Sequence, residues 1–242
     1  AYDSYSFHVI YQRLHQFCSV DLGGFYLDVL KDRVYTARAD SRARRSAQTA
    51  MFHLLEALAR WMAPMLSVTA EEIWQNMPGR RGASVLLETW YTLPDDPAQD
   101  ELTSEAYWDK VLAVREQVAR ELEKARVAGA LGASLEAEVD LYVDAELCTL
   151  LTKLGEELRF VLITSEARVQ DLAANPSAGV ETGLKGLRVQ VNPSVHAKCA
   201  RCWHRRADVG ATAEHPQLCA RCVTNVAGQG EAYQPAVEEA GV

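Results

Sequence analysis

The sequence predicts a mainly α-helical protein with a small α+β part and a C-terminal finger built on four cysteines. Three observations lead to this fold class. Apolar residues recur at the helical period of 3.6 through the first third of the chain, the period changes to two near residue 139, and two Cys-x-x-Cys motifs lie near the end. A length of 242 residues allows two or three compact domains.

Composition and charge restrict the class of protein. An apolar fraction of 48% and a charged fraction of 24% are typical of folded globular chains. No window reaches the ~18 apolar residues of a membrane span, and Ala1-Tyr2-Asp3-Ser4 does not have the basic start and apolar core of a targeting segment. We therefore expect a cytoplasmic protein, or a piece of one, without a membrane partner. The net charge of −8 is concentrated in residues 95–197, so it does not exclude an anionic partner at either end.

Helical patterns fill the first third of the chain. Apolar stripes predict helices over 5–18 and 21–30, and a longer helix from Ser41 that ends at Pro64. Thr69-Ala-Glu-Glu72 has the form of a capping box and predicts the start of the next helix. We therefore expect residues 1–94 to form a helical bundle with its linker, incomplete at the N-terminal side.

The middle of the chain predicts a small α+β domain over residues 104–193. Its expected order is helix, strand, helix, strand, strand, since alternation at 135–143 and at 187–191 is typical of half-buried strands. A β-branched run at 159–164 predicts the strand between them. Residues 194–228 then contain the cysteine finger, and residues 229–242 read as a flexible tail.

The cysteine motifs predict a metal centre. Cys199-Ala-Arg-Cys202 and Cys219-Ala-Arg-Cys222 are separated by sixteen residues, which is typical of a tetrahedral Zn²⁺ site with four thiolate ligands. One zinc would be structural here, because four protein ligands leave no position for a reacting water. A redox-active pair of dithiols is the alternative. His204 and His215 flank the motifs, and we expect them at the surface rather than on the metal.

Cations and one aromatic residue surround the cysteines. Trp203 directly follows Cys202, and a stiff turn that presents an indole beside guanidinium groups favours stacking on an unpaired base and binding of phosphate. The alternative is that Trp203 packs over the metal loop as its core, and the sequence leaves both interpretations open. The neighbouring cations are Lys198, Arg201, Arg205, Arg206 and Arg221.

With these motifs, the chain resembles the C-terminal portion of bacterial-type isoleucyl-tRNA synthetases. The likeness covers nearly the whole chain and rests on segments at 17–33, 35–38, 43–49, 60–64, 69–74, 199–204, 208–210 and 219–228. The resemblance implies a helical anticodon-binding domain, an α+β junction domain, and a zinc-binding end that folds over the anticodon stem-loop of isoleucine tRNA.

The resemblance also implies an enzyme of which this chain is one part. Such a ligase attaches isoleucine to its tRNA using ATP in protein biosynthesis. The ATP-binding motifs His-Ile-Gly-His and Lys-Met-Ser-Lys-Ser do not occur here, and the editing domain is absent as well. We therefore expect this chain alone to have no catalytic residue or activity, and to work as a monomer with the rest of the synthetase upstream.

Two groups of residues are candidates for RNA contact. In the finger, Trp203 would stack on a base while Arg201, Arg205 and Arg206 hold the backbone. In the helical part, Arg38, Arg42, Arg44 and Arg45 would contact phosphates, although the same arginines are also compatible with a solvated face paired to nearby aspartates.

Two other classes of protein share part of this pattern. Formamidopyrimidine-type DNA glycosylases end in a similar finger, but they need an N-terminal Pro-Glu that Ala1-Tyr2 does not supply. A free-standing zinc-finger RNA-binding module is the other alternative.

Overall fold

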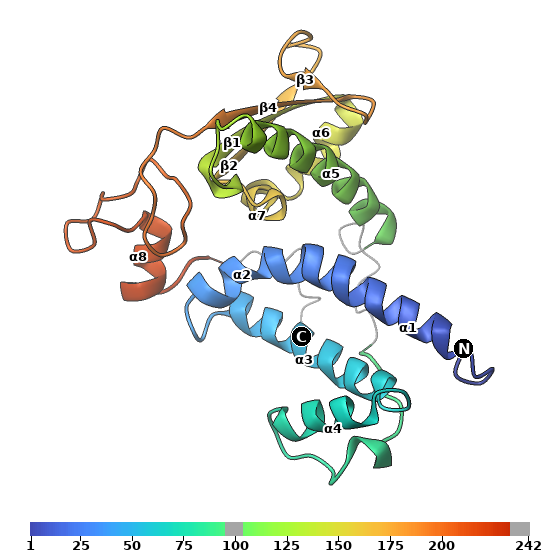
Figure 1. Ribbon diagram of the computed structural model, residues 1–242. Coiled ribbons are helices and arrows are strands. Elements are labelled where there is room, and N and C mark those ends of the chain that lie inside the picture. Colours follow the sequence, from blue (N-terminus) through green and yellow to red (C-terminus); the bar gives the residue numbers. More distant parts are fainter. Residues whose placement is uncertain (95–103, 233–242) are drawn as a thin grey trace, which may run out of the picture. The chain divides into compact units, whose positions relative to one another are not determined.

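The computed structural model describes residues 1–94 and 104–232, which fall into two compact units (Figure 1). The first unit comprises Ala1–Val34 and Ala39–Pro97, and the second comprises Tyr35–Arg38 and Ala98–Val242. Among the described helices, none combines the length and the apolar character that a membrane span requires.

The first unit begins with one continuous helical run rather than the two helices predicted. Helix α1 (Phe7–Gln16) passes into a π-helical segment, η1 (Phe17–Tyr26), and then into α2 (Leu27–Thr36). The two glycines at 23 and 24 lie inside the π segment, where a Cβ on Gly23 would approach the Cys18 carbonyl oxygen to 3.1 Å. Glycine at position 23 therefore permits the close backbone approach within this segment, although glycines weaken an ordinary α-helix.

Helix α3 (Arg42–Met62) follows the sequence prediction closely. The Ser41 side chain accepts a hydrogen bond from the Arg44 amide and caps the helix, which ends before Pro64. Helix α4 (Ser67–Asn76) begins two residues before Thr69, so the predicted capping box is wrong. The Leu66 carbonyl already accepts from the Ala70 amide, which places Thr69 within the first turn.

A small core and a buried charge cluster join α3 to the segment after α4. Trp74 is 2% exposed and packs beside Val85 of the short 3₁₀ helix η2 (Val85–Leu87). The Arg60 and Arg81 guanidinium groups each lie 4.7 Å from the Trp74 ring centre. Both arginines also bind the Glu56 carboxylate, at 2.5 and 2.6 Å, so the charges are paired where they are buried.

The second unit contains a four-stranded sheet covered on one face by helices (Figure 1). The strand order is β2-β1-β4-β3, with β1 and β2 parallel and the other neighbours antiparallel. The elements are α5 (Glu105–Val127), η4 (Ser134–Glu136), β1 (Ala137–Val143), α6 (Ala145–Thr152), η5 (Gly155–Glu157), α7 (Leu158–Leu162), β2 (Glu166–Asp171), β3 (Val180–Glu181) and β4 (Leu187–Pro193).

The strand predicted over 159–164 is wrong. Residues Leu158–Leu162 form helix α7, and the strand begins later, at Glu166. Leu158, Val161 and Leu162 are buried at the spacing of one helical face. Ile163 then adopts a left-handed conformation, with φ of 56°, and ends the helix.

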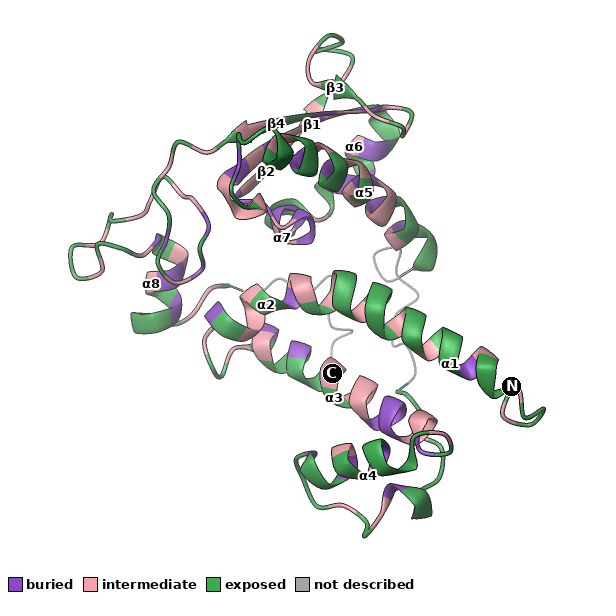
Figure 2. Cartoon of the chain, viewed as in Figure 1, coloured by how far each residue is buried: buried purple, intermediate pink, exposed green. Residues whose placement is uncertain are grey.

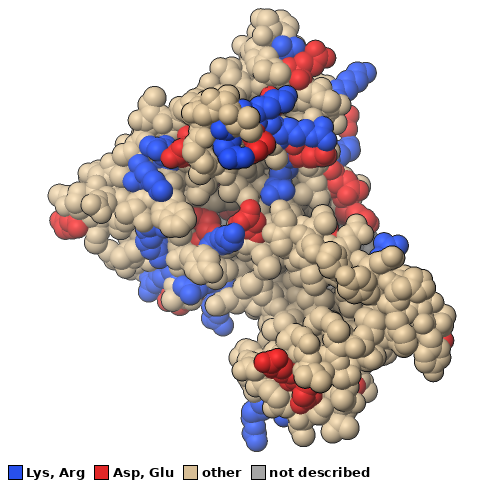
Figure 3. Space-filling model, viewed as in Figure 1, with Lys and Arg blue, Asp and Glu red and all other residues tan. Residues whose placement is uncertain are grey.

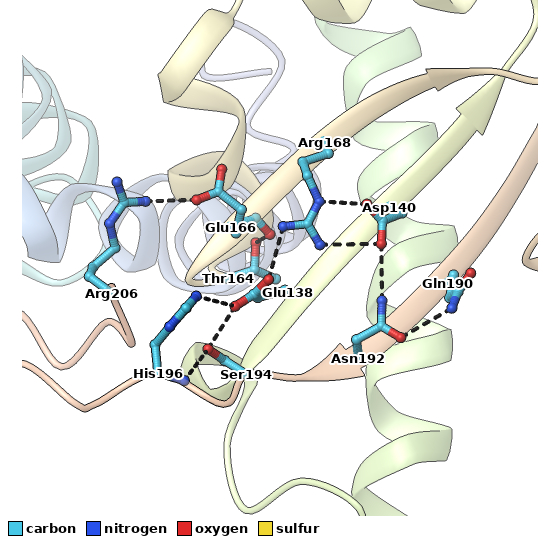
Figure 4. Close-up of polar contacts among 10 residues, drawn as sticks. All are labelled: Glu138, Asp140, Thr164, Glu166, Arg168, Gln190, Asn192, Ser194, His196 and Arg206. Carbon is cyan, nitrogen blue, oxygen red and sulfur yellow. Dashed lines mark hydrogen bonds and ion pairs between the residues drawn. The ribbon is translucent and has the colours of Figure 1, made fainter. Parts of the chain in front are cut away.

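The sheet has one apolar and one polar face. Along β1, Ala137, Val139, Leu141 and Val143 are each 0% exposed, and Figure 2 shows buried residues on the strand and on the helices that cover it. The intervening Glu138 and Asp140 lie on the open face. There they bind Arg168 of β2 at 2.9 and 2.6 Å (Figure 4). This face is therefore internally neutralised rather than strongly basic.

Candidate metal centre and RNA-binding surface

The four cysteines of the motifs meet in one small cluster. Cys199 and Cys202 lie on a tight turn in which the Trp203 amide donates to the Cys199 carbonyl at 3.0 Å. Cys219 precedes helix α8 (Ala220–Ala227) and Cys222 lies in its first turn. All four Sγ atoms lie within 4.8 Å of one another, and all four cysteines are buried.

This cluster fits a tetrahedral zinc ion. Zn–S bonds of about 2.3 Å in a tetrahedron place the sulfurs about 3.8 Å apart. The Sγ atoms of Cys202 and Cys219 are 3.8 Å apart. Four thiolates gathered this closely would repel one another, and a bound dication offsets that repulsion. The cluster would hold zinc as a structural ion.

The flanking histidines do not join this cluster. His204 is 3% exposed, so the expectation that it lies at the surface is wrong. Its ring packs edge-on against Phe160 of α7, with the ring centres 5.5 Å apart. The carbonyl of His204 accepts from the Cys199 amide at 2.9 Å, which turns the backbone of the finger back on itself.

Trp203 lies outside the core of the finger. Its side chain is 60% exposed, and the partly buried residues that pack on the cysteines are Val209 and Leu218. Its backbone adopts the left-handed conformation, with φ of 67°, a region in which glycine is favoured over any bulky residue. A strained and exposed indole contributes little to folding, which argues against the core-packing alternative.

The predicted RNA-contacting arginines of the finger have protein partners in the structure. Arg201 donates to the carbonyl oxygens of Thr36 and Tyr35. Arg205 binds Glu136 at 3.0 Å, and Arg206 binds Glu166 at 2.8 Å. Arg38 likewise reaches the Gly228 carbonyl at 3.2 Å, within the same unit. Their predicted phosphate contacts stay predictions.

The other predicted arginines surround the start of α3. Arg42, Arg44 and Arg45 occupy its first turn, which contains no acidic residue. Cations at a helix N-terminus are opposed by the helix dipole, so they do not stabilise this helix. Their placement adds to the positive potential of the helix start and suits an anionic partner.

A groove that the sequence did not predict lies beside the start of α3. It has a volume of about 520 Å³, and Arg45, Gln48, Thr49 and Phe52 follow one another along its α3 side. Phe52 is 39% exposed, and the Arg81 guanidinium lies 5.7 Å from its ring centre. These four residues are spaced i, i+3, i+4 and i+7 on the face of α3 opposite its apolar stripe. This spacing is the sequence signal that could have identified the groove. The remaining lining residues are Met51, Leu55 and Pro78.

The surface of the α+β part suits an anionic partner less well than the start of α3 does. Acidic and basic side chains are interspersed over this part of the surface (Figure 3). Among them are the ion pairs Lys110–Glu146, at 2.6 Å, and Arg126–Glu123, at 2.7 Å. Such surface pairs neutralise one another and leave little net field.

The chain thus combines a helical unit, a small α+β sheet and a finger whose four cysteines fit a zinc ion. Two family profiles match it. Residues 1–141 match the anticodon-binding domain of tRNA ligase, and residues 198–225 match the zinc finger found in FPG and IleRS. Since the first match covers more than half of the chain, the protein belongs to the family of tRNA-ligase anticodon-binding domains.

Curated relatives agree with this family. The chain is 56% identical over 231 residues to an isoleucine–tRNA ligase of Nitrosococcus oceani, 58% over 234 residues to one of Thioalkalivibrio sulfidiphilus, and 56% over 238 residues to one of Azotobacter vinelandii. These matches cover 96%, 96% and 97% of the chain but 25% of each relative, so the chain spans about a quarter of their length. The resemblance to isoleucyl-tRNA synthetases is confirmed.

The comparisons also decide between the alternatives. The finger profile is shared by glycosylases and synthetases, so it does not separate them. The profile that covers residues 1–141 is that of a tRNA-ligase domain, not of a glycosylase. The isoleucine–tRNA ligase relatives align with this part and with the finger together. The glycosylase and the free-standing module are therefore not favoured.

Proposed function

We propose that this chain is the part of an isoleucine–tRNA ligase that binds the anticodon stem-loop of isoleucine tRNA. The observation that carries the proposal is Trp203, an exposed indole in a strained conformation on a four-cysteine finger, joined in one chain to an anticodon-binding family domain. Base stacking on an aromatic ring is the common way of reading unpaired RNA.

Two surfaces of the chain contact the RNA in this proposal. At the start of α3, Arg42, Arg44 and Arg45 meet phosphates, and the adjoining groove receives an unstacked base against Phe52. On the finger, Trp203 stacks on a second base, and Arg38 and Arg201 contribute positive charge nearby. Arg205 and Arg206 lie on the same finger and were also predicted to hold phosphate.

The rest of the ligase supplies the chemistry. ATP binding, formation of the aminoacyl-adenylate and editing lie in the part of the protein outside this chain, and the zinc of the finger is structural. The domain division at 1–94, 104–193, 194–228 and 229–242 belongs to this proposal, with the last range lying largely outside the described residues. We also propose that the ligase is a cytoplasmic monomer.

A binding comparison tests the function. The ligase that contains this chain should bind isoleucine tRNA more tightly than the same tRNA with an exchanged anticodon, because only the bases of the loop differ. Its affinity for isoleucine tRNA should also fall steeply between 50 and 200 mM salt, about tenfold or more for several phosphate contacts. Equal affinity for the two tRNAs would contradict the proposal.

A further inference from the structure

The segment after Trp203 connects the finger to the sheet of the same unit. The Arg205 amide donates to the Ser165 hydroxyl at 2.6 Å, and that hydroxyl donates in turn to the Leu135 carbonyl at 2.5 Å. Ser165 is fully buried, so its hydroxyl is a fixed acceptor rather than a surface contact. The backbone of the finger is therefore attached where β2 begins.

The side chains of this segment extend the attachment. Arg205 binds the Glu136 carboxylate at 3.0 Å and the His196 carbonyl at 3.3 Å. Arg206 binds Glu166 at 2.8 Å (Figure 4). Each of the two ion pairs is about one-third exposed. Glu136 also accepts from the Gly132 amide at 2.9 Å, so the acid that receives Arg205 is itself held in place.

An aromatic contact completes the attachment. The buried His204 ring packs against Phe160 of α7, and the Arg221 guanidinium of α8 lies 4.9 Å from the same ring centre. Phe160 is therefore contacted by both halves of the finger. A hydrogen bond, two ion pairs and a ring contact converge within three consecutive residues, His204, Arg205 and Arg206.

We propose that His204–Arg206 is a docking strip that fixes the finger on the sheet, and that Arg205 and Arg206 act as positioning residues for Trp203 rather than as phosphate ligands. The proposal rests on the RNA-binding function above. Trp203 immediately precedes the strip, so its indole is oriented before RNA arrives. Pre-organisation of this kind reduces the ordering that binding would otherwise require.

The two roles predict opposite effects of removing the acids. If the arginines held phosphate, Glu136→Gln and Glu166→Gln would release them and remove repulsion, and tRNA affinity would rise. If the arginines position the finger, the double variant loses both ion pairs, and affinity falls about tenfold at most. Glu214→Gln is the matched control, since Glu214 is exposed on the finger and the substitution removes one charge without touching the strip.

A charge swap supplies the second measurement. Arg206→Glu and Glu166→Arg in the full ligase should each weaken tRNA binding, and the double variant should recover most of the affinity because the ion pair re-forms with reversed sign. Zinc content and melting temperature, measured for each variant, show that the finger remains folded. A double variant as weak as Arg206→Glu alone, or a higher affinity after Glu136→Gln and Glu166→Gln, would overturn the docking strip.

The Trp203→Gly variant distinguishes a wrong docking role from a wrong RNA-binding role. If Trp203→Gly weakens tRNA binding while the acid variants do not, the finger binds RNA and only the docking role is wrong. If Trp203→Gly leaves binding unchanged, the RNA-binding role of the finger is wrong as well.

Discussion

The Lys198 ammonium lies 5.2 Å from the centre of the Trp203 ring. The two residues flank the first pair of cysteines, so the turn that holds the metal also brings a cation over one face of the indole. A cation over an aromatic face is attractive, and it orders a side chain that is 60% exposed. The opposite face of the ring remains suited to stacking on a base.

Replacement of Trp203 by glycine should separate folding from binding. The left-handed backbone at this position favours glycine, so Trp203→Gly should leave the melting temperature unchanged or slightly raised. The affinity for tRNA should fall about tenfold, since one stacking contact is lost. Trp203→Phe retains an aromatic face and should lose less. A destabilised glycine variant with normal affinity would assign Trp203 to the finger core.

Removal of zinc should unfold the finger alone. About thirty residues bury too little apolar surface to fold without the metal, whereas the sheet has its own core in Val139 and Leu141. After chelation, hydrogen exchange should accelerate across 198–228 and stay slow across β1. Cys148→Ser is a control outside the cluster and should retain one zinc per chain. Unchanged exchange in a metal-free finger would contradict a structural zinc.

Phe52 should contribute to RNA binding through the groove on α3. Phe52→Ala removes the aromatic wall, and tRNA affinity should fall about tenfold, the effect of one lost stacking contact. Leu86→Ala provides the control, because Leu86 is a more exposed apolar residue of the same unit and lines no part of the groove. Equal affinities of the two variants in a filter-binding assay would exclude the groove as a base-binding site.

The sequence predicts those parts of the fold that depend on local pattern. Ser41 and Pro64 mark the ends of α3, and alternation identifies β1, because each signal lies within the element that it defines. In α7 only Phe160 and Val161 favour strands, whereas the other three residues are good helix formers, and the β-branched Ile163 and Thr164 lie after the helix; burial of one face decides for the helix. The four-cysteine cluster is also predictable, because each pair lies within four residues and the spacing of the two pairs is typical of a zinc site.

The remainder of the site depends on contacts that local pattern does not contain. Arg205 and Glu136 are 69 positions apart, and Arg206 and Glu166 are 40 apart. From the sequence, these arginines are cations beside a metal site. Only the packing of the finger against the sheet pairs them with acids, which is why their predicted and observed surroundings differ.

The stability of the second unit should fall in acid because of Glu138. Burial disfavours its ionised form, but hydrogen bonds from Arg168 and Ser194 outweigh this and lower its pKa below the ordinary value of 4.5. Its contribution is therefore complete above pH 4.5 and is lost as the pH falls through the lowered pKa. Between pH 6 and pH 3, urea midpoints should decline less for Glu138→Gln than for the parent. Glu146 has a side chain that is 71% exposed, so the urea midpoint of Glu146→Gln should decline with pH as much as that of the parent.

Glu56 should be the most sensitive acidic residue of the first unit. Its carboxylate is 6% exposed and accepts from Arg60 and Arg81, whose side chains are only 12% and 11% exposed. Glu56→Gln removes the carboxylate that both guanidinium groups share; Arg60 keeps a longer contact with Glu88 at 3.4 Å, but Arg81 loses its ion pair. The free energy of unfolding should therefore fall by about 3 kcal/mol. Glu72→Gln, on the exposed side of α4, should change it by less than about 0.5 kcal/mol. Urea denaturation followed by circular dichroism measures both variants. If they unfold at the same midpoint, the Glu56 cluster does not hold α3 to the segment after α4.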